Sequence, residues 1–414
     1  MSQSYASAPA AIAPTGEAPN RPLFADGPFG PRVDAARARV AESIGAAFAP
    51  HAAADERGVF PREVLADLGR SRLLRQRWHP GPFGDTGLGV LIAEESGRYG
   101  HAGLSVGVSL CLETVGSILV RYGDSPLLQE YLDGLLDGRL IGCFGASEPT
   151  GGSDLTGMRT AARRVPGGGW RVTGEKRYLS LGLVCDFALL LCRIENDSGE
   201  ADGGLGVFAV PASALSVRKR LRKVGTAALD TTWMTIDAVV PDEALVGRPG
   251  AGLLVATWGL SHERLSIAGQ TVGAVAAATG LAAAHLHRRE QFGRPLLQHQ
   301  ALRLRLADLS ARLLSLRFAV YSAAQGVSVT GACGPRETAA LKVTATRFAE
   351  EAMSECMHLF GGAGYLEDET PLSRMWRDTR LGRIGAGTDE MMWELVASGM
   401  TPDFVGYDEL VDLG

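Results

Sequence analysis

The sequence predicts an α+β protein with an N-terminal all-α domain, a central β-barrel or sandwich, and a C-terminal four-helix bundle. Apolar residues recur at three- and four-residue steps before about Arg139 and again after Gly252, which is the helical period. Between them lie short β-type runs broken by Gly, Asp and Pro. A chain of 414 residues is also too long for one small core. We expect these divisions: a disordered tail 1–30, helical domain 31–139, β-domain 140–247, bundle 248–400 and tail 401–414.

The N-terminal region begins with an Ala/Pro/Ser-biased stretch that lacks the basic start and hydrophobic core of a secretory signal. Helical patterns then run from Pro31 to Arg139. One of them, residues 101–123, is apolar and rich in small residues, with Thr114 as its most polar central member. Such a helix can line a pocket, although packing in the core is the commoner explanation.

The central region carries one strongly basic cluster, RKRLRK at residues 218–223. Its cations stand in a β-type run. It is either a solvated strand face, the commoner case, or a docking site for an acidic partner protein.

The C-terminal region opens with a helical pattern from Gly252 to Gly293 that can be nearly continuous. Glu263 and Arg289 are 26 residues apart in it, which corresponds to about 39 Å along a helix. They therefore cannot serve the same end of one ligand. Two further amphipathic helices and a shorter one complete the expected bundle.

Composition excludes several classes of protein. The net charge of −5 argues against a general nucleic-acid binder. The six cysteines are scattered without a CxxC pair, so we expect buried free thiols in a reducing compartment and no metal site. Apolar runs of membrane-spanning length without a charge are missing, which predicts a cytoplasmic protein without a membrane partner.

Five segments follow one another along the chain: CFGASEPTGGSDLTGMRTAA, EKRYLSLG, ERLSIAGQTVG with HRREQFGRPLLQHQ, MHLFGGAGYLEDETPLSRMWRDTR, and IGAGTDE. In this order and spacing they resemble the acyl-CoA dehydrogenase family over about residues 31–400. The first also has a physical interpretation of its own: Gly151–Ser153 frees backbone donors at a turn, which suits an electron-rich ring or a phosphate. A plain Gly-rich turn is the alternative.

The resemblance implies FAD as cofactor. It places one group of residues at the flavin ring and pyrophosphate: Phe144, Ala146, Ser147, Gly152, Ser153, Tyr178, Leu179 and Ser180. It matches a second group to contacts with the FAD of a neighbouring subunit: Arg289, Phe292, Gln300, His358 and Gly362. Thr388 and Glu390 match positions near the adenine. A homotetramer or homodimer follows from the resemblance.

The family's usual catalytic carboxylate is missing, because Ala386 stands at its position before Gly387 and Thr388. Ala386 retains a backbone N–H that can polarise a thioester carbonyl. Some family members carry the base instead on the glutamate before an arginine at the start of the long helix, here Glu263 before Arg264. His262 is a weaker candidate, and an exposed Glu263 paired with a neighbour is the structural alternative. Arg264 and Ser153 are expected on the substrate side.

Three functions remain open from the sequence. The first is FAD-dependent α,β-dehydrogenation of an acyl thioester of CoA or of a carrier protein, with Glu263 taking the α-proton and an electron-transferring flavoprotein as possible acceptor. The second is a flavin-dependent monooxygenase or oxidase on the same fold, which needs no such base. The third is a non-catalytic flavin-binding or structural oligomer, which the nearly complete set of flavin positions disfavours.

Overall fold

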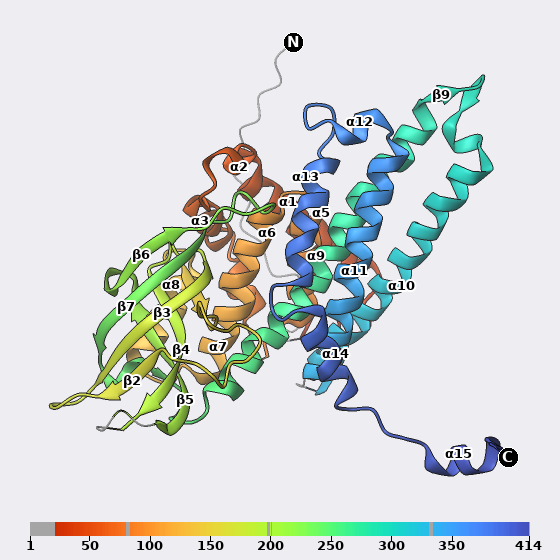
Figure 1. The fold of residues 1–414 in the computed structure, drawn as a ribbon. Helices are drawn as coiled ribbons and strands as arrows, with labels where there is room; N and C mark the ends of the chain where they lie inside the picture. The colour runs from red at the N-terminus through yellow and green to blue at the C-terminus, as the bar shows by residue number, and fades with distance from the viewer. Residues whose placement is uncertain (1–20, 80–82, 197–198, 200, 331–333, 414) are drawn as a thin grey trace.

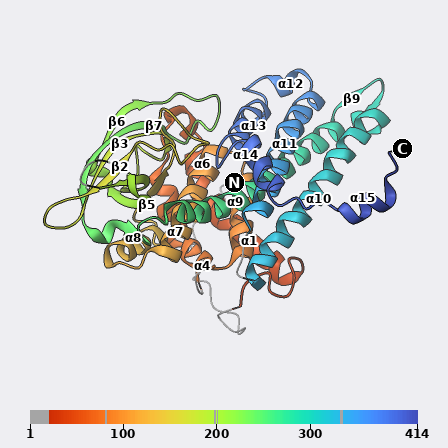
Figure 2. The ribbon, with the colours of Figure 1, turned by 60° about the horizontal axis from the view of Figure 1, so that its bottom comes forward.

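The computed structural model describes residues 21–413 apart from 80–82, 197–198, 200 and 331–333. It confirms the predicted order of a helical domain, a β-domain and a helical bundle. In Figure 1 the N-terminal helices lie between the sheet on one side and the C-terminal helices on the other, and Figure 2 shows the same arrangement from below.

The N-terminal domain consists of helices α1 (Pro31–Phe48), η1 (Ala49–His51), α2 (Ala54–Arg57), α3 (Arg62–Arg70), α4 (Leu73–Arg77), α5 (Thr86–Arg98), α6 (Ala102–Ser109), η2 (Leu110–Val115), α7 (Gly116–Tyr122) and α8 (Pro126–Leu136). Its core begins within the predicted tail, because Leu23 and Phe24 are buried and the Phe24 ring packs 5.1 Å from that of Tyr321. The boundary expected at residue 30 therefore lies after the first core side chains.

The apolar segment around Thr114 forms one run of helix whose middle, η2, is a π-helix. A π turn widens the helix by one residue and occurs mostly at functional sites. This π-helix was not predicted from the sequence. Thr114 itself is fully buried.

The described residues of the β-domain form an eight-stranded sheet with the strand order β6-β7-β3-β2-β4-β5-β8, and β1 pairs with β4 outside this path. Its strands are β1 (Gly142–Gly145), β2 (Ala161–Arg164), β3 (Trp170–Ser180), β4 (Phe187–Glu195), β5 (Ala201–Pro211), β6 (Leu215–Arg220), β7 (Thr231–Val240) and β8 (Leu245–Val246), with short helices η3 (Ala212–Ala214) and η4 (Asp242–Ala244). Pairing is mostly antiparallel, whereas β4 runs parallel to both β1 and β2. The basic cluster falls on β6, the edge strand, and on the two residues that follow Leu221.

The C-terminal region contains α9 (Gly252–Arg288), β9 (Glu290–Gln291), β10 (Arg294–Pro295), η5 (Leu296–Gln298), α10 (Gln300–Thr330), α11 (Pro335–Leu359), α12 (Gly362–Tyr365), α13 (Leu372–Thr379), η6 (Arg380–Arg383), α14 (Asp389–Ala397) and α15 (Phe404–Leu410). The predicted continuity of α9 is confirmed, since one helix carries Glu263 and ends immediately before Arg289. α9 packs against α5, α10 and α11 and so forms the centre of the molecule (Figure 1).

Within the described residues, two helical segments, Ala102–Tyr122 and Gly252–Arg288, are long and apolar enough to cross a membrane by length and composition alone. Inside the protein, 83% of the first one's apolar window and 50% of the second one's is buried, as in core helices of a folded domain. The predicted buried thiols are confirmed for Cys111, Cys143, Cys185, Cys192 and Cys356, which are all free. Cys333 lies outside the described residues.

Candidate active site

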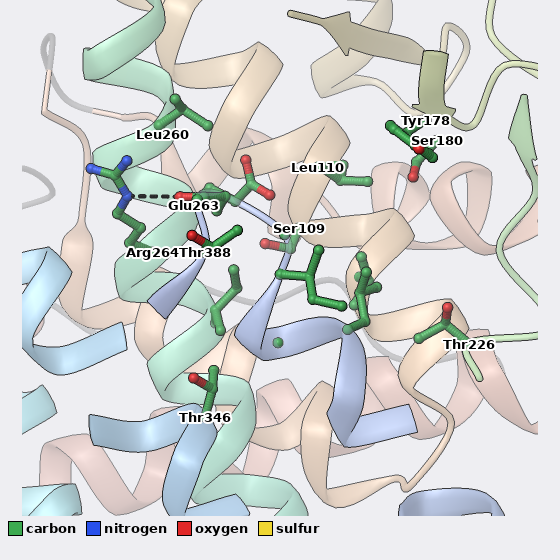
Figure 3. A pocket seen from close by; sticks show the side chains of 18 of the residues that line it. Ser109, Leu110, Tyr178, Ser180, Thr226, Leu260, Glu263, Arg264, Thr346 and Thr388 are labelled. Atoms are coloured by element: carbon green, nitrogen blue, oxygen red, sulfur yellow. Dashed lines mark hydrogen bonds between the residues drawn. The ribbon is translucent and has the colours of Figure 1, made fainter. Parts of the chain in front are cut away.

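A cavity of about 1130 Å³ lies where the three domains meet, and most of the predicted site residues line it. This exceeds the roughly 300–1,000 Å³ of a usual ligand pocket. The predicted residues that line it are Phe144, Ala146, Ser147, Gly152, Ser153, Tyr178, Leu179, Ser180, Glu263, Arg264, Ala386 and Thr388. In Figure 3, Tyr178 and Ser180 lie across the cavity from Leu260 and Glu263.

The β-wall of the cavity is held by a buried carboxylate that the sequence did not single out. Glu148 accepts hydrogen bonds from the backbone N–H of Arg159 at 2.8 Å and of Thr160 at 2.7 Å, and it pairs with Lys176 at 3.1 Å. These contacts, together with the bridge between Glu148 and Gly151, fix both ends of the Gly-rich turn. The turn therefore presents its polar groups to the cavity in a set position.

Tyr178 leaves the sheet at a β-bulge. The register of β3 and β7 shifts between Arg177 and Leu179, and Tyr178 has φ 65°, a strained value for a residue that is not glycine. Its side chain is 59% exposed and its ring faces the Arg177 guanidinium at 5.0 Å, whereas Leu179 is buried. Since such strain recurs at ligand sites, this exposed ring on the cavity wall indicates a surface for a planar group.

Glu263 is the acidic side chain at the centre of the site. It is 9% exposed, and the Thr114 hydroxyl donates to its Oε2 at 3.0 Å. Burial raises the pKa of Glu263, and the Thr114 hydrogen bond and the charges of Arg264 and Lys342 oppose that rise only in part. Its carboxylate points into the space next to Ser109 and Leu110 (Figure 3). The exposed-carboxylate alternative is thus wrong, because Glu263 is buried against the cavity.

The terminal loop with Ala386 is fixed by two cations through its carbonyl oxygens. Arg264 Nε donates to the Ala386 carbonyl at 3.0 Å, and Lys342 Nζ donates to that of Gly387 at 2.6 Å. Both residues have positive φ, 55° at Ala386 and 105° at Gly387. Thr388 then caps α14 by accepting from the Met391 N–H. Within the described residues the Ala386 N–H has no acceptor, so it remains available to a ligand.

His262, the weaker candidate base, faces away from the cavity. Its ring packs against those of Trp78 and Trp258 at 5.4 and 4.9 Å, and its Nδ1 lies 3.4 Å from Arg77. Burial and the Arg77 charge lower the pKa of His262 to about 3, so the ring is neutral at physiological pH. His262 is not among the described residues that line the cavity. His262 therefore serves the packing between α9 and the N-terminal domain.

The remaining predicted residues do not line the cavity formed by the described part of the chain. They are Arg289, Phe292, Gln300, His358, Gly362 and Glu390, and all are exposed. Five of them gather around the β9–β10 hairpin and the start of α12, at the far end of the bundle (Figure 1), whereas Glu390 begins α14. This separation agrees with the length argument for Arg289 made from the sequence.

Sequence reasoning missed Lys342, which is buried and holds the terminal loop. Burial lowers the pKa of Lys342 to about 8. A signal was present: the residues three and four positions away on the helix, Thr338, Ala339, Ala345 and Thr346, are small and face the core, so Lys342 shares a buried face. Thr114 had been noticed but was assigned to packing.

The cavity suits a ligand that consists of a planar ring and a polar tail, with space for an organic substrate beside the ring. An exposed tyrosine ring at a strained backbone position, serine hydroxyls and a Gly-rich turn form one wall, and a carboxylate of raised pKa forms the opposite one. A carboxylate with such a pKa can accept a proton from carbon more readily than an ordinary one.

Comparison with known proteins identifies the family. The N-terminal, middle and C-terminal domain models of acyl-CoA dehydrogenases match residues 31–139, 143–239 and 250–401. This chain belongs to the acyl-CoA dehydrogenase family. Members of that family are flavoprotein oxidoreductases, and the predicted fold and enzyme class are confirmed.

Among its family relatives, the chain is 45% identical to the acyl-[acyl-carrier-protein] dehydrogenase MbtN of Mycobacterium sp. (strain MCS), over 88% of this chain and 92% of that protein. It is 32% identical to the mitochondrial isovaleryl-CoA dehydrogenase of Oryza sativa subsp. japonica, over 83% and 85%. Among solved structures, a probable acyl-CoA dehydrogenase from Mycobacterium abscessus superposes with a TM-score of 0.81 at 29% identity, covering 90% of this chain and 99% of that one.

Proposed function

We propose that this protein removes two hydrogens from the α and β carbons of an acyl thioester carried on phosphopantetheine, with Glu263 as the base. The observation that carries the proposal is the Glu263 carboxylate, which lies buried at the cavity while Ala386 supplies no carboxylate. It is the buried glutamate of the cavity wall whose pKa is raised by burial. The similarity to a protein named acyl-[acyl-carrier-protein] dehydrogenase favours a carrier-bound substrate over acyl-CoA.

The cavity residues fit FAD. When bound, FAD supplies the acceptor for the hydride that leaves the β-carbon. Tyr178, Leu179 and Ser180 would hold one side of its ring, with Phe144, Ala146 and Ser147 beside it. Gly152 and Ser153 would meet the pyrophosphate. A side chain at position 152 would narrow this approach, because its Cβ would lie 3.3 Å from the Ser147 hydroxyl oxygen.

The other roles are assigned to this chain's own groups. Glu263 takes the α-proton, and the Thr114 hydrogen bond orients its carboxylate. The Ala386 N–H donates to the thioester carbonyl, and Arg264 and Lys342 hold the loop so that this donor stays in place. Arg264 and Ser153 border the substrate.

Most of the predicted site residues that do not line the cavity would act across a subunit interface. Arg289, Phe292, Gln300, His358 and Gly362 would contact the FAD of a neighbouring subunit in a homotetramer or homodimer. Thr388 and Glu390 would lie near the adenine. An electron-transferring flavoprotein would reoxidise the cofactor, in the cytoplasm.

The test is desaturation of thioesters by the flavin-loaded enzyme, followed by mass spectrometry. Decanoyl groups on pantetheine, CoA and a bacterial acyl carrier protein serve as substrates. Glu263→Gln should lower kcat by about 10²–10⁴-fold, the usual contribution of a general base, while flavin content stays constant. Glu42→Gln, an exposed α1 residue, is the matched control.

Two results would contradict the proposal at different points. If the kcat of Glu263→Gln lies within about threefold of the wild-type kcat, Glu263 is not the base. A wild-type enzyme that desaturates none of the thioesters would remove the activity itself. Rapid reaction of the reduced enzyme with oxygen would favour the oxidase or monooxygenase alternative.

A further inference from the structure

The basic strip, defined as Arg218–Lys223, lies at the mouth of the cavity. Lys219, Leu221, Arg222 and Lys223 line the cavity, although the strip belongs to the edge of the β-domain. The sequence alone left its position relative to the pocket open.

The strip is held in place at the junction of the three domains. The loop after it donates from the Thr226 N–H to Asp378 of α13, and Ala228 packs so closely on α6 that a Cβ at Gly103 would lie 2.9 Å from it. Positions next to the strip are therefore fixed by both helical regions.

The strip keeps most of its positive charge. Arg218 pairs with Glu175, but Arg220 binds the backbone carbonyls of Arg57 and Gly58, which position a guanidinium without neutralising it. Lys223 donates to the Leu229 carbonyl and the Thr231 hydroxyl, and its charge also acts on the nearby Asp230 carboxyl.

Within the basic strip, Lys219 and Arg222 are the exposed cations whose side chains make no ion pair or hydrogen bond with another described residue. Both stand at the rim. The whole chain has 41 basic and 46 acidic residues, so this concentration of cations is a local exception on an acidic protein.

Protection of a sheet edge explains part of the strip. Lysine and arginine on an edge strand discourage pairing with other chains, which accounts for Arg218 to Arg220 on β6. It does not account for Arg222 and Lys223, because they follow the strand and line the cavity.

The strip also exposes apolar side chains beside its charges. Val217 is 49% exposed and Val224 is 74% exposed. A free phosphate group gains nothing from valine, whereas protein interfaces combine an apolar contact with a charged rim. Arg218 and Arg220 also extend the positive surface beyond the rim, farther than a ligand confined to the cavity needs.

We propose that the basic strip docks the acidic surface of a phosphopantetheine-bearing carrier protein, so that the arm enters the cavity past Lys219 and Arg222. This inference rests on the proposed function and adds the surface that selects the carrier. Complementary charge at the mouth speeds encounter in the productive orientation, while the acidic remainder of the protein repels the carrier elsewhere.

The experiment compares Lys219→Glu/Arg222→Glu with Arg39→Glu/Arg248→Glu. The second pair consists of exposed arginines away from the cavity and changes the net charge equally. Flavin-loaded enzymes are assayed with decanoyl-loaded bacterial acyl carrier protein, decanoyl-CoA and decanoyl-pantetheine. We expect kcat/KM for the carrier substrate to fall at least about tenfold more than that for pantetheine in the strip variant only. Added salt should weaken the wild-type carrier reaction and leave the pantetheine reaction nearly constant.

Other outcomes overturn the docking proposal. An equal loss with decanoyl-CoA would mean that the strip recognises the phosphates of CoA, and an equal loss with all three substrates would mean damage to the cavity. Val224→Ser keeps the charges, and it should weaken only the carrier reaction. If wild type desaturates no thioester, the proposed function fails, and docking is then judged by titrating holo-carrier protein against wild type and the strip variant. Equal affinity in that titration would overturn it.

Discussion

At the scale of single residues, the site depends on opposing effects on one carboxylate. Burial disfavours the ionised form of Glu263, whereas the Thr114 hydroxyl and the charges of Arg264 and Lys342 favour it. Because burial is the larger effect, the group binds its proton more tightly in the folded protein than in the unfolded chain.

This balance predicts a pH-dependent stability difference for Glu263→Gln. Because the pKa of Glu263 is raised in the folded protein, its contribution to stability is fully present below its unfolded pKa and is lost as pH rises through its folded pKa. Glutamine cannot ionise, so the melting temperature of the variant relative to wild type should rise with pH across that window and then level off. Thermal melts of both proteins over a pH series, with Glu42→Gln showing a flat difference, provide the check. A difference that falls with rising pH would contradict the sign.

A second residue-scale prediction concerns Thr114→Val. The hydroxyl donates to the carboxylate and lowers the pKa of Glu263, so its loss should move the acidic limb of the kcat/KM profile to higher pH. Thr114→Ser keeps the donor and should restore the wild-type limb. A loss of rate in Thr114→Val without a shift of the limb would indicate a packing role only. The profile is measured with decanoyl-pantetheine.

At the scale of elements, the site depends on how closely α9 approaches α5. A Cβ at Gly97 would overlap the carbonyl oxygen of Gln270, and one at Gly273 would overlap that of Glu94. The two backbones therefore touch through glycines, and this contact sets the position of the helix that carries Glu263.

Gly273→Ala should destabilise the protein by about 1–3 kcal/mol, because the added methyl must separate two packed backbones. Gly280→Ala is the matched control on the same helix. A Cβ there meets nothing within 4 Å, so alanine should stabilise the helix by up to about 1 kcal/mol. Urea unfolding of both variants measures the difference, and equal stability would show that α5 can move away without cost.

At the scale of the whole molecule, a single subunit leaves the end of its helical bundle with the β9–β10 turn and α12 exposed to solvent. Phe292 is 92% exposed and has φ 54° in the β9–β10 turn, and the Tyr365 ring of α12 is also exposed. Apolar rings presented together at one end indicate a contact surface. The proposed neighbouring subunit would cover it.

Phe292→Asp should therefore reduce both the oligomeric mass and the bound flavin. Val239→Asp, which replaces an exposed apolar residue on β7, should change neither. Light scattering after gel filtration gives the mass, and the ratio of flavin to protein absorbance gives the occupancy. A monomeric wild-type protein with full flavin content would exclude the shared site.

The sequence by itself determined the order of the three domains and the continuity of α9, and its resemblance to a known family indicated most of the predicted residues that line the cavity. Helical and strand periods, and glycine at turns, depend on residues that are near one another in the chain, so the sequence shows them directly. The tertiary structure decided the rest. Nearly every face of α9 around Glu263 is buried, so periodicity could not show where that carboxylate points, and only packing turned it to the cavity and His262 away from it. The pairing of Thr114 with Glu263, the hold of Lys342 on the terminal loop and the position of the basic strip at the cavity mouth join residues far apart in the chain. Such long-range contacts depend on how whole domains meet, and no local pattern encodes that.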